Sequence, residues 1–272
     1  ALLDNYRFYN RGKPEGVKTV LFKRCLDVND RVLRKIVTGL DTPNNGIPSE
    51  TGFVITPASE IMAVLCLSES LDELRQKIDD MLLGYTFAGN GFTTQDLGVT
   101  GAITALLKDA IQPNLVQTLE GTPAMIHGGP FANIAHGCNS LMATKTALQF
   151  GDYVVTEAGF ASDLGAEKFF NIKCRKAGLQ PAMSVLVATS QALKLSGGAT
   201  EKTMMLPDKE TLKKGLRNLE KHISILKSFG QRVLVSLNKY HFDTEEELAY
   251  LRSWCAEHVP RDWRAAQTGV GD

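Results

Sequence analysis

Residues 122–175 read TPAMIHGGPFANIAHGCNSLMATKTALQFGDYVVTEAGFASDLGAEKFFNIKCR, and this stretch decides how the rest of the chain is interpreted. Two short apolar runs, 124–126 and 153–155, each lead into a glycine-rich loop, and a helical pattern follows each loop. In an open α/β sheet such loops lie at the carboxyl ends of strands, where ligands bind. Glycine lets the backbone approach a ligand closely, and the free N–H groups of the next helix start favour anions. The stretch therefore predicts an α/β fold with a ligand-binding edge.

The same alternation continues toward the carboxyl terminus and predicts the fold class. The apolar runs are short, continuous and rich in valine, which is typical of parallel strands that are buried on both faces. Right-handed crossovers between them would build a doubly wound, mostly parallel sheet flanked by helices. The expected strands are 124–127, 153–156, 184–189 and 232–238, and the expected helices are 139–150, 165–177, 208–229 and 244–257.

The first part of the chain is predicted to be a helix-rich α/β subdomain. The apolar spacing after Asn29-Asp30 suits a short amphipathic helix. Ser59 and Ser70 are expected to begin two further helices as N-caps, and a fourth helix is expected over residues 96–112. Residues 53–55 are a short strand candidate, and 113–123 form a strand-and-loop unit.

Composition excludes several classes of function. Thirty basic residues balance thirty acidic ones. The chain therefore lacks the basic surplus that is typical of nucleic-acid-binding proteins. No apolar run approaches the roughly 20 residues that span a bilayer. The five cysteines have no CxxC spacing, which argues against a zinc site or a disulfide framework and indicates a reducing compartment, either the cytoplasm or the mitochondrial matrix.

The glycine-rich loop HGGPFANIAHG offers the first set of candidate site residues. His127, Asn133 and His136 could contact a substrate phosphate or carboxylate beside a backbone cradle. The alternative is a tight loop whose glycines only permit close packing.

The second loop, TEAGF, is followed by a helix start with acidic and basic residues. Glu157 comes at a strand end, where a carboxylate would face the cleft and could hold Mg²⁺ or an amine. Asp163 opens the next helix and Lys168 lies in its first turn, where capping alone also explains the aspartate. Further on, Asn238 ends a valine-rich strand and Tyr240 follows two residues later.

These motifs carry a family resemblance. HGGPFANIAHGCNS, and TEAGF followed by DLGAEKFFxIKCR, resemble formate–tetrahydrofolate ligase, also called 10-formyltetrahydrofolate synthetase. The likeness runs from residue 1 to about residue 251. It implies tetrahydrofolate and MgATP as ligands, and a reaction in which ATP phosphorylates formate and N10 of tetrahydrofolate then attacks the formyl phosphate.

The resemblance also implies where the folate would bind. NKYHFDT (238–244) resembles the family segment N-x-F-x-x-D-T, whose aromatic ring stacks on the pterin, and Tyr240 occupies that aromatic position. The alternative is a tyrosine that merely covers the sheet edge. Trp263 matches a second stacking aromatic in W-A-x-G-G-x-G, but Ala266-Gln267 stand in place of its two glycines.

The likeness covers only the central part of the family's sequence. The phosphate-binding loop GxxxxGK(S/T), the upstream R-E-P-S segment and the C-terminal domain have no counterpart in these residues. We therefore expect three parts: a helix-rich subdomain (1–121), the second half of a nucleotide-domain-like parallel sheet (122–258) and an irregular tail (259–272).

Three functions remain open at this point. The chain could be part of a ligase that is catalytically incomplete alone and has no ATP site of its own. It could instead be a non-catalytic, ligase-derived subunit of a larger assembly, or a folate-binding module. Partners would be the folate and other protein chains, in a homo-oligomer or a larger complex.

Overall fold

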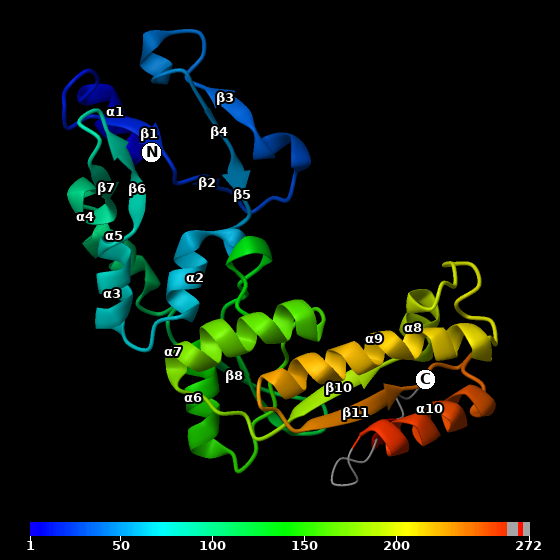
Figure 1. Ribbon diagram of the computed structural model, residues 1–272. Coiled ribbons are helices and arrows are strands. Elements are labelled where there is room, and N and C mark those ends of the chain that lie inside the picture. The colour runs from blue at the N-terminus through cyan, green and yellow to red at the C-terminus, as the bar shows by residue number, and fades with distance from the viewer. Residues whose placement is uncertain (260–265, 269–272) are drawn as a thin grey trace. The chain divides into compact units, whose positions relative to one another are not determined.

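The computed structural model describes residues 1–259 and 266–268, which form two compact units divided after Glu157 (Figure 1). The division after residue 121 that the sequence pattern predicts is a different boundary and stays a prediction.

The first unit begins with a small antiparallel sheet covered by one helix. Its strands are β1 (Val17–Val20), β6 (Leu82–Thr86) and β7 (Gly91–Thr93), in the order β1-β6-β7. Helix α1 (Leu2–Tyr9) packs on it, with the Tyr6 ring 4.6 Å from that of Phe92. Val17, Leu83 and Phe92 are the buried centre of this layer.

Four helices form the next layer of the first unit. They are α2 (Glu60–Cys66), α3 (Leu71–Asp79), α4 (Thr94–Leu97) and α5 (Thr100–Leu107). The predicted serine caps are confirmed, since Ser59 accepts from the Met62 N–H at 3.2 Å and Ser70 from the Glu73 N–H at 3.1 Å. The single helix expected over 96–112 is wrong, because Gly98 in a left-handed conformation ends α4 before α5 begins.

The amphipathic helix predicted after Asn29-Asp30 is also wrong. Asp30 caps only one 3₁₀ turn, η1 (Arg31–Arg34), after which β3 (Ile36–Thr38) pairs antiparallel with β4 (Ser49–Thr51). β-Branched residues fill β3, and they favour strands over helices. Nearby, β2 (Arg24–Cys25) pairs with β5 (Phe53–Val54), where the sequence predicts a strand.

The strand expected at 124–127 exists, but it is not part of a parallel sheet. β9 (Pro123–Ile126) pairs antiparallel with β8 (Asn114–Gln117). Five residues connect them, and Gly121 adopts φ 85° in a turn where its N–H bonds to the Thr118 carbonyl. So short a connection can only join antiparallel strands, and this decides the direction of β9.

The strand expected at 153–156 does not form. The segment has no regular structure, although α6 (Leu141–Phe150) before it matches the predicted helix. Tyr153 and Val155 are 93% and 94% exposed. Strands are stabilised by pairing and burial, and none of the described strands pairs with this segment.

The second unit contains the parallel sheet that the sequence predicts, in a smaller form. Its strands β10 (Ser184–Ala188), β11 (Val233–Asn238) and β12 (Ala266–Thr268) are parallel and lie in that order. β12 falls in the tail that we expected to be irregular. The structure therefore confirms a mixed α/β fold, whereas the described strands do not form one doubly wound sheet.

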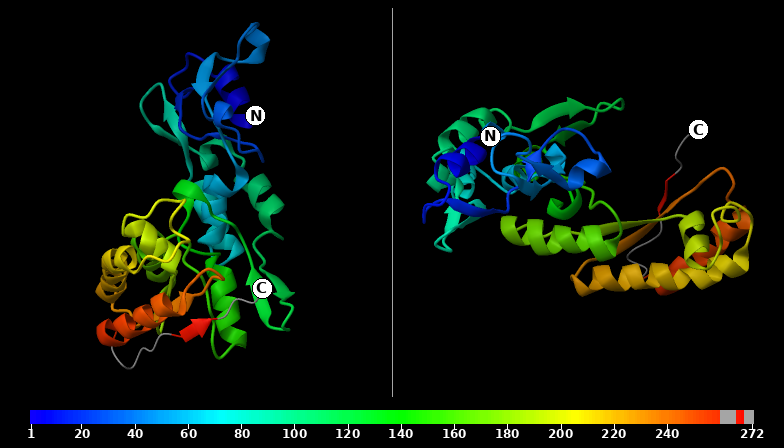
Figure 2. Two further views of the ribbon diagram at one scale, coloured as in Figure 1. Left: turned by 90° about the vertical axis from the view of Figure 1, so that its right-hand side faces the viewer. Right: turned by 90° about the horizontal axis from the view of Figure 1, so that it is seen from above.

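Helices of the second unit precede and follow β10 and β11 along the chain. The helical stretch at 162–177 consists of π-helical turns η5 (Ser162–Ala166) and η6 (Phe169–Cys174) followed by α7 (Arg175–Ala177). The others are α8 (Ser190–Ser196), α9 (Lys209–Ser228) and α10 (Glu245–His258). Figure 2 shows the long α9 (yellow to orange) beside the strands from two further directions.

The core of this unit lies on one side of β10. Leucines of α9 pack against Val233, Val235 and Leu237 of β11 and Ala188 of β10. Val185 and Val187, on the opposite face of β10, are 52% and 61% exposed. The expectation of burial on both faces is therefore wrong for β10 within the described residues.

None of the helices in the described part of the chain is long and apolar enough to cross a membrane.

Candidate functional site

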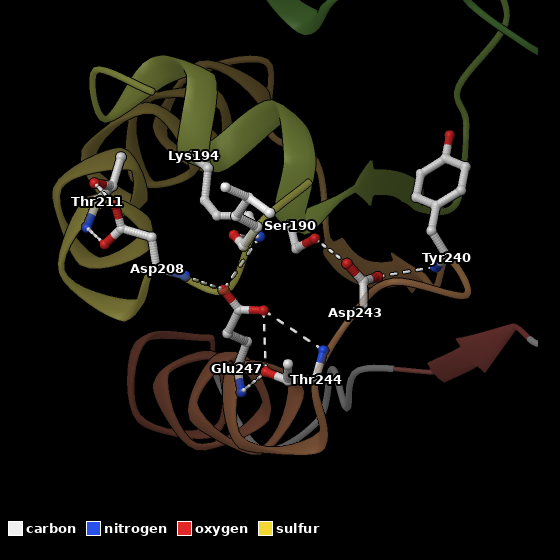
Figure 3. Close-up of polar contacts among 9 residues, drawn as sticks. Ser190, Lys194, Asp208, Thr211, Tyr240, Asp243, Thr244 and Glu247 are labelled. Carbon is white, nitrogen blue, oxygen red and sulfur yellow. Dashed lines mark hydrogen bonds and ion pairs between the residues drawn. The ribbon is translucent and has the colours of Figure 1, made fainter. Parts of the chain in front are cut away.

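The carboxyl ends of β10 and β11 bring two chain segments together (Figure 3). The strands are parallel and in register, with Ala188 opposite Leu237, so both end at the same edge of the sheet. β10 continues into Ser190 at the start of α8, and β11 continues into the loop 239–243 before α10. This is the sheet edge where the sequence predicts a ligand site.

Tyr240 lies in that loop with a fixed backbone. Its N–H donates to Oδ2 of Asp243 at 2.8 Å, and its carbonyl accepts from the Asp243 N–H at 3.1 Å. The Tyr240 ring is stacked on Phe242, with 5.3 Å between centroids and 7° between planes. Because Tyr240 is still 38% exposed, part of an aromatic surface remains open to a flat ligand.

Asp243 also contacts the neighbouring strand end. Its Oδ1 accepts a hydrogen bond from the Ser190 hydroxyl, and both residues are buried. Ser190 is free to do this because Thr189 caps α8, accepting from the Ala192 N–H at 3.1 Å.

A fully buried ion pair lies behind this loop. Lys194 Nζ is 3.1 Å from Glu247 Oε1 and donates to the Leu206 carbonyl at 2.9 Å. Glu247 also accepts from the Asp208 N–H at 3.0 Å and from the Thr244 hydroxyl, with which it forms the capping box of α10. Burial alone would raise the pKa of Glu247, but these hydrogen bonds and the lysine together hold that pKa below its ordinary value.

Asn238 stands at the end of β11, where the sequence predicts it. Its Oδ1 is buried and accepts no hydrogen bond from the residues that the structure describes. A buried amide oxygen without a donor is uncommon in proteins, so this acceptor could serve a ligand donor at the sheet edge.

The candidates from the first glycine loop are placed in the first unit. His127 is buried, and its Nε2 lies 2.7 Å from the Ala110 carbonyl while Nδ1 lies 2.5 Å from the Ser140 hydroxyl. Since a carbonyl only accepts, Nε2 carries the proton and Nδ1 accepts from Ser140. The His127 ring therefore connects the loop to the start of α6 through Nδ1 and to the segment after α5 through Nε2. His136 is buried as well, whereas Asn133 is exposed.

The candidates from the second loop are distributed between the two units. Glu157 is exposed at the end of the first unit. Asp163 is exposed in the first turn of η5, and Lys168 is partly buried at the start of η6. Trp263 lies outside the described residues.

Sequence reasoning missed Ser190, Asp243, Lys194 and Glu247. One signal was available, because Thr244-x-x-Glu247 is a capping-box pattern. Nothing in the sequence indicates that Lys194 is buried, since lysines at helical spacing usually lie on a solvated face.

Comparisons with known proteins show the family of this chain. The sequence profile of the family described as formate–tetrahydrofolate ligase matches residues 1–268. Formate–tetrahydrofolate ligases of Bacteroides fragilis and Bacteroides thetaiotaomicron are 62% identical over 257 residues, which is 94% of this chain and 46% of each relative. That of Porphyromonas gingivalis is 58% identical over 255 residues, with the same coverage. The chain thus spans about half the length of these relatives, and it belongs to the formate–tetrahydrofolate ligase family.

Proposed function

We propose that this chain supplies the tetrahydrofolate-facing surface of a formate–tetrahydrofolate ligase, which joins formate to N10 of tetrahydrofolate with MgATP. The family match supports the reaction, and the position of Tyr240 supports the role of this part of the chain. The 272 residues contain no GxxxxGK(S/T) sequence, so the phosphoryl chemistry would need residues outside them.

The observation that carries the proposal is the partly exposed Tyr240 ring at the carboxyl edge of the parallel sheet. The Phe242 ring stacks on the Tyr240 ring, and hydrogen bonds to Asp243 hold the Tyr240 backbone. A pterin ring can stack on such a flat face. It also carries N–H groups that could donate a hydrogen bond to the buried Asn238 Oδ1. Stacking of a heterocycle on an aromatic side chain contributes about 1–3 kcal/mol.

The experiment is a titration of the wild type and three variants with tetrahydrofolate, monitored by fluorescence. Tyr240→Ala should weaken binding by about 1–3 kcal/mol, and Tyr240→Phe should retain most of the affinity because the ring is kept. Tyr9→Ala, at an exposed tyrosine of α1, is the matched control and should leave affinity unchanged. Equal affinity of Tyr240→Ala and wild type would contradict the proposal.

A parallel assay separates the two folate-binding alternatives from a non-catalytic subunit. Without residues for the triphosphate, the chain alone should form no formyltetrahydrofolate from formate, MgATP and tetrahydrofolate. Folate binding without turnover supports the ligase part or a folate-binding module. Absence of both activities would favour a non-catalytic, ligase-derived subunit of a larger assembly.

The sheet of the second unit could belong to a larger, doubly wound one. Val185 and Val187 leave an apolar face of β10 open, and β11 is its only partner among the described strands. We infer that sequence beyond these residues covers β10 in a full-length ligase. Slower amide exchange in β10 of such a protein than in this chain alone would support the inference.

The relatives compared are bacterial, so they give no support to a mitochondrial location.

A further inference from the structure

The loop between β11 and α10 is organised by one carboxylate. Asp243 is 8% exposed and stands directly before Thr244, the N-cap of α10 (Figure 3). Its side chain accepts from the Tyr240 N–H while its own N–H donates to the Tyr240 carbonyl. Residue 243 therefore fixes the peptide groups on both sides of Tyr240 and closes a four-residue turn.

Ser190 connects this turn to the sheet. It is 2% exposed and donates its hydroxyl to the second oxygen of Asp243. Ser190 stands two residues after Ala188, the last residue of β10, and β10 pairs in register with β11. The turn is therefore held at both strand ends, and the backbone that carries the Tyr240 ring is connected to the sheet.

Helix capping does not account for Asp243. Thr244 and Glu247 already form the complete capping box of α10, and Glu245 and Glu246 add acidic charge to its first turn. Both carboxylate oxygens of Asp243 are directed instead to the Tyr240 backbone and to Ser190. A buried carboxylate with these two partners has a geometric role in the turn.

We propose that Asp243, anchored by Ser190, is a positioning residue that sets the Tyr240 ring at the angle needed to stack on a pterin. The inference rests on the proposed function, because it assumes that Tyr240 faces the folate. It extends that function to two buried residues that do not touch the ligand and that control its affinity through the ring.

The test uses a full-length ligase that contains this chain, with steady-state kinetics and tetrahydrofolate titrations. Asp243→Ala should raise the KM and Kd for tetrahydrofolate about tenfold, the loss expected when a hydrogen bond to a charged group is removed. The KM values for ATP and formate should stay within about twofold of wild type, because the loop is expected to face only the folate.

Conservative variants separate positioning from general destabilisation. Asp243→Asn should bind nearly as well as wild type, since its carbonyl can accept from Tyr240 and its amide can donate to Ser190. Ser190→Ala should show a smaller loss than Asp243→Ala. Glu246→Ala removes an exposed acid from the start of the same helix and should leave the tetrahydrofolate KM unchanged. If Asp243→Ala fails to fold, these variants still decide the question.

A double-mutant cycle gives the decisive comparison. In a Tyr240→Ala background, Asp243→Ala should cost no further folate affinity, because there is no ring left to position. A further tenfold loss in that background would overturn the positioning role. So would an Asp243→Ala enzyme that keeps its tetrahydrofolate KM while kcat and Tm fall. If Tyr240→Ala itself leaves the affinity unchanged, the proposed function fails too, whereas a loss for Tyr240→Ala but none for Asp243→Ala refutes only the positioning role.

Discussion

At the scale of single residues, the buried pair of Lys194 and Glu247 is the contact whose loss should cost most. The Lys194 side chain is fully buried and that of Glu247 is only 3% exposed, so each would be left charged and buried if its partner were removed. Lys194→Met should therefore lower the free energy of unfolding by about 3–5 kcal/mol, measured by urea denaturation.

The exposed pair of Lys213 and Glu210 is the matched control. Its atoms are 2.6 Å apart, closer than those of the buried pair, but both side chains are in contact with water. Lys213→Met should change the unfolding free energy by about 0–1 kcal/mol. Equal effects of the two substitutions would mean that Lys194 is not buried as the structure places it.

The lowered pKa of Glu247 predicts how stability depends on pH. The native state favours the ionised carboxylate, so the unfolded state binds more protons near the ordinary glutamate pKa of about 4.3. The contribution is complete above that pH and is lost as the pH falls through the native pKa. Wild type should therefore lose stability faster than Glu247→Gln on acidification below about pH 5. The measurement is thermal unfolding of both proteins between pH 7 and pH 3. An equal loss of stability in both proteins would contradict this assignment.

At the residue scale, only part of the candidate site could be predicted from the sequence. Tyr240 and Asn238 could be predicted because they follow a recognisable strand within a family-like segment. The roles of Ser190 and Asp243 could not, because they depend on the register of β10 with β11, which brings together residues 53 apart in the chain. His127 was open to either interpretation until its two buried partners were known.

At the scale of elements, α8 and α9 touch through a glycine. A Cβ atom added at Gly215 of α9 would lie 1.8 Å from the Leu193 carbonyl oxygen of α8, which is too close for any contact. Gly215→Ala should force the two helices apart and destabilise the protein by about 1–3 kcal/mol, measured by thermal or urea unfolding.

Gly101 provides the control for that substitution. It lies in α5, and a Cβ atom there would meet nothing within 4 Å. Alanine in an open helical position stabilises by about 0.5–1 kcal/mol relative to glycine, so Gly101→Ala should raise the stability. If both alanine variants were stabilising, the close approach of α8 and α9 would be wrong.

Elements with local signals were predictable, whereas those decided by distant contacts were not. Three helix starts could be predicted from Ser59, Ser70 and Thr244, and the valine-rich runs predicted β10 and β11. The segment 153–156 also has an apolar sequence, but none of the described strands pairs with it. Ile36–Thr38 reads as part of a helix until its pairing with Ser49–Thr51 is seen. Pairing is a tertiary property, and periodicity alone does not contain it.

At the scale of the whole molecule, the division into two units coincides with an exposed segment. Residues 152–161 have no regular structure, and Phe150, Tyr153 and Phe160 are 80%, 93% and 82% exposed. Proteases cut where the backbone is accessible and can open locally at little cost. Each unit has its own hydrophobic core, so each should persist for a time after the connection is cut.

Limited proteolysis tests this division. Chymotrypsin cuts after aromatic residues and should first cleave the chain at Phe150, Tyr153 or Phe160, giving two fragments that mass spectrometry can assign. Trypsin is the control, because residues 146–167 contain no lysine or arginine and this segment must survive it. Tyr240 and Trp254 should resist chymotrypsin longer, since a hydrogen-bonded turn holds Tyr240 and Trp254 lies within α10. First cuts within α9 or α10, with 150–160 still intact, would show that the two units do not divide after Glu157.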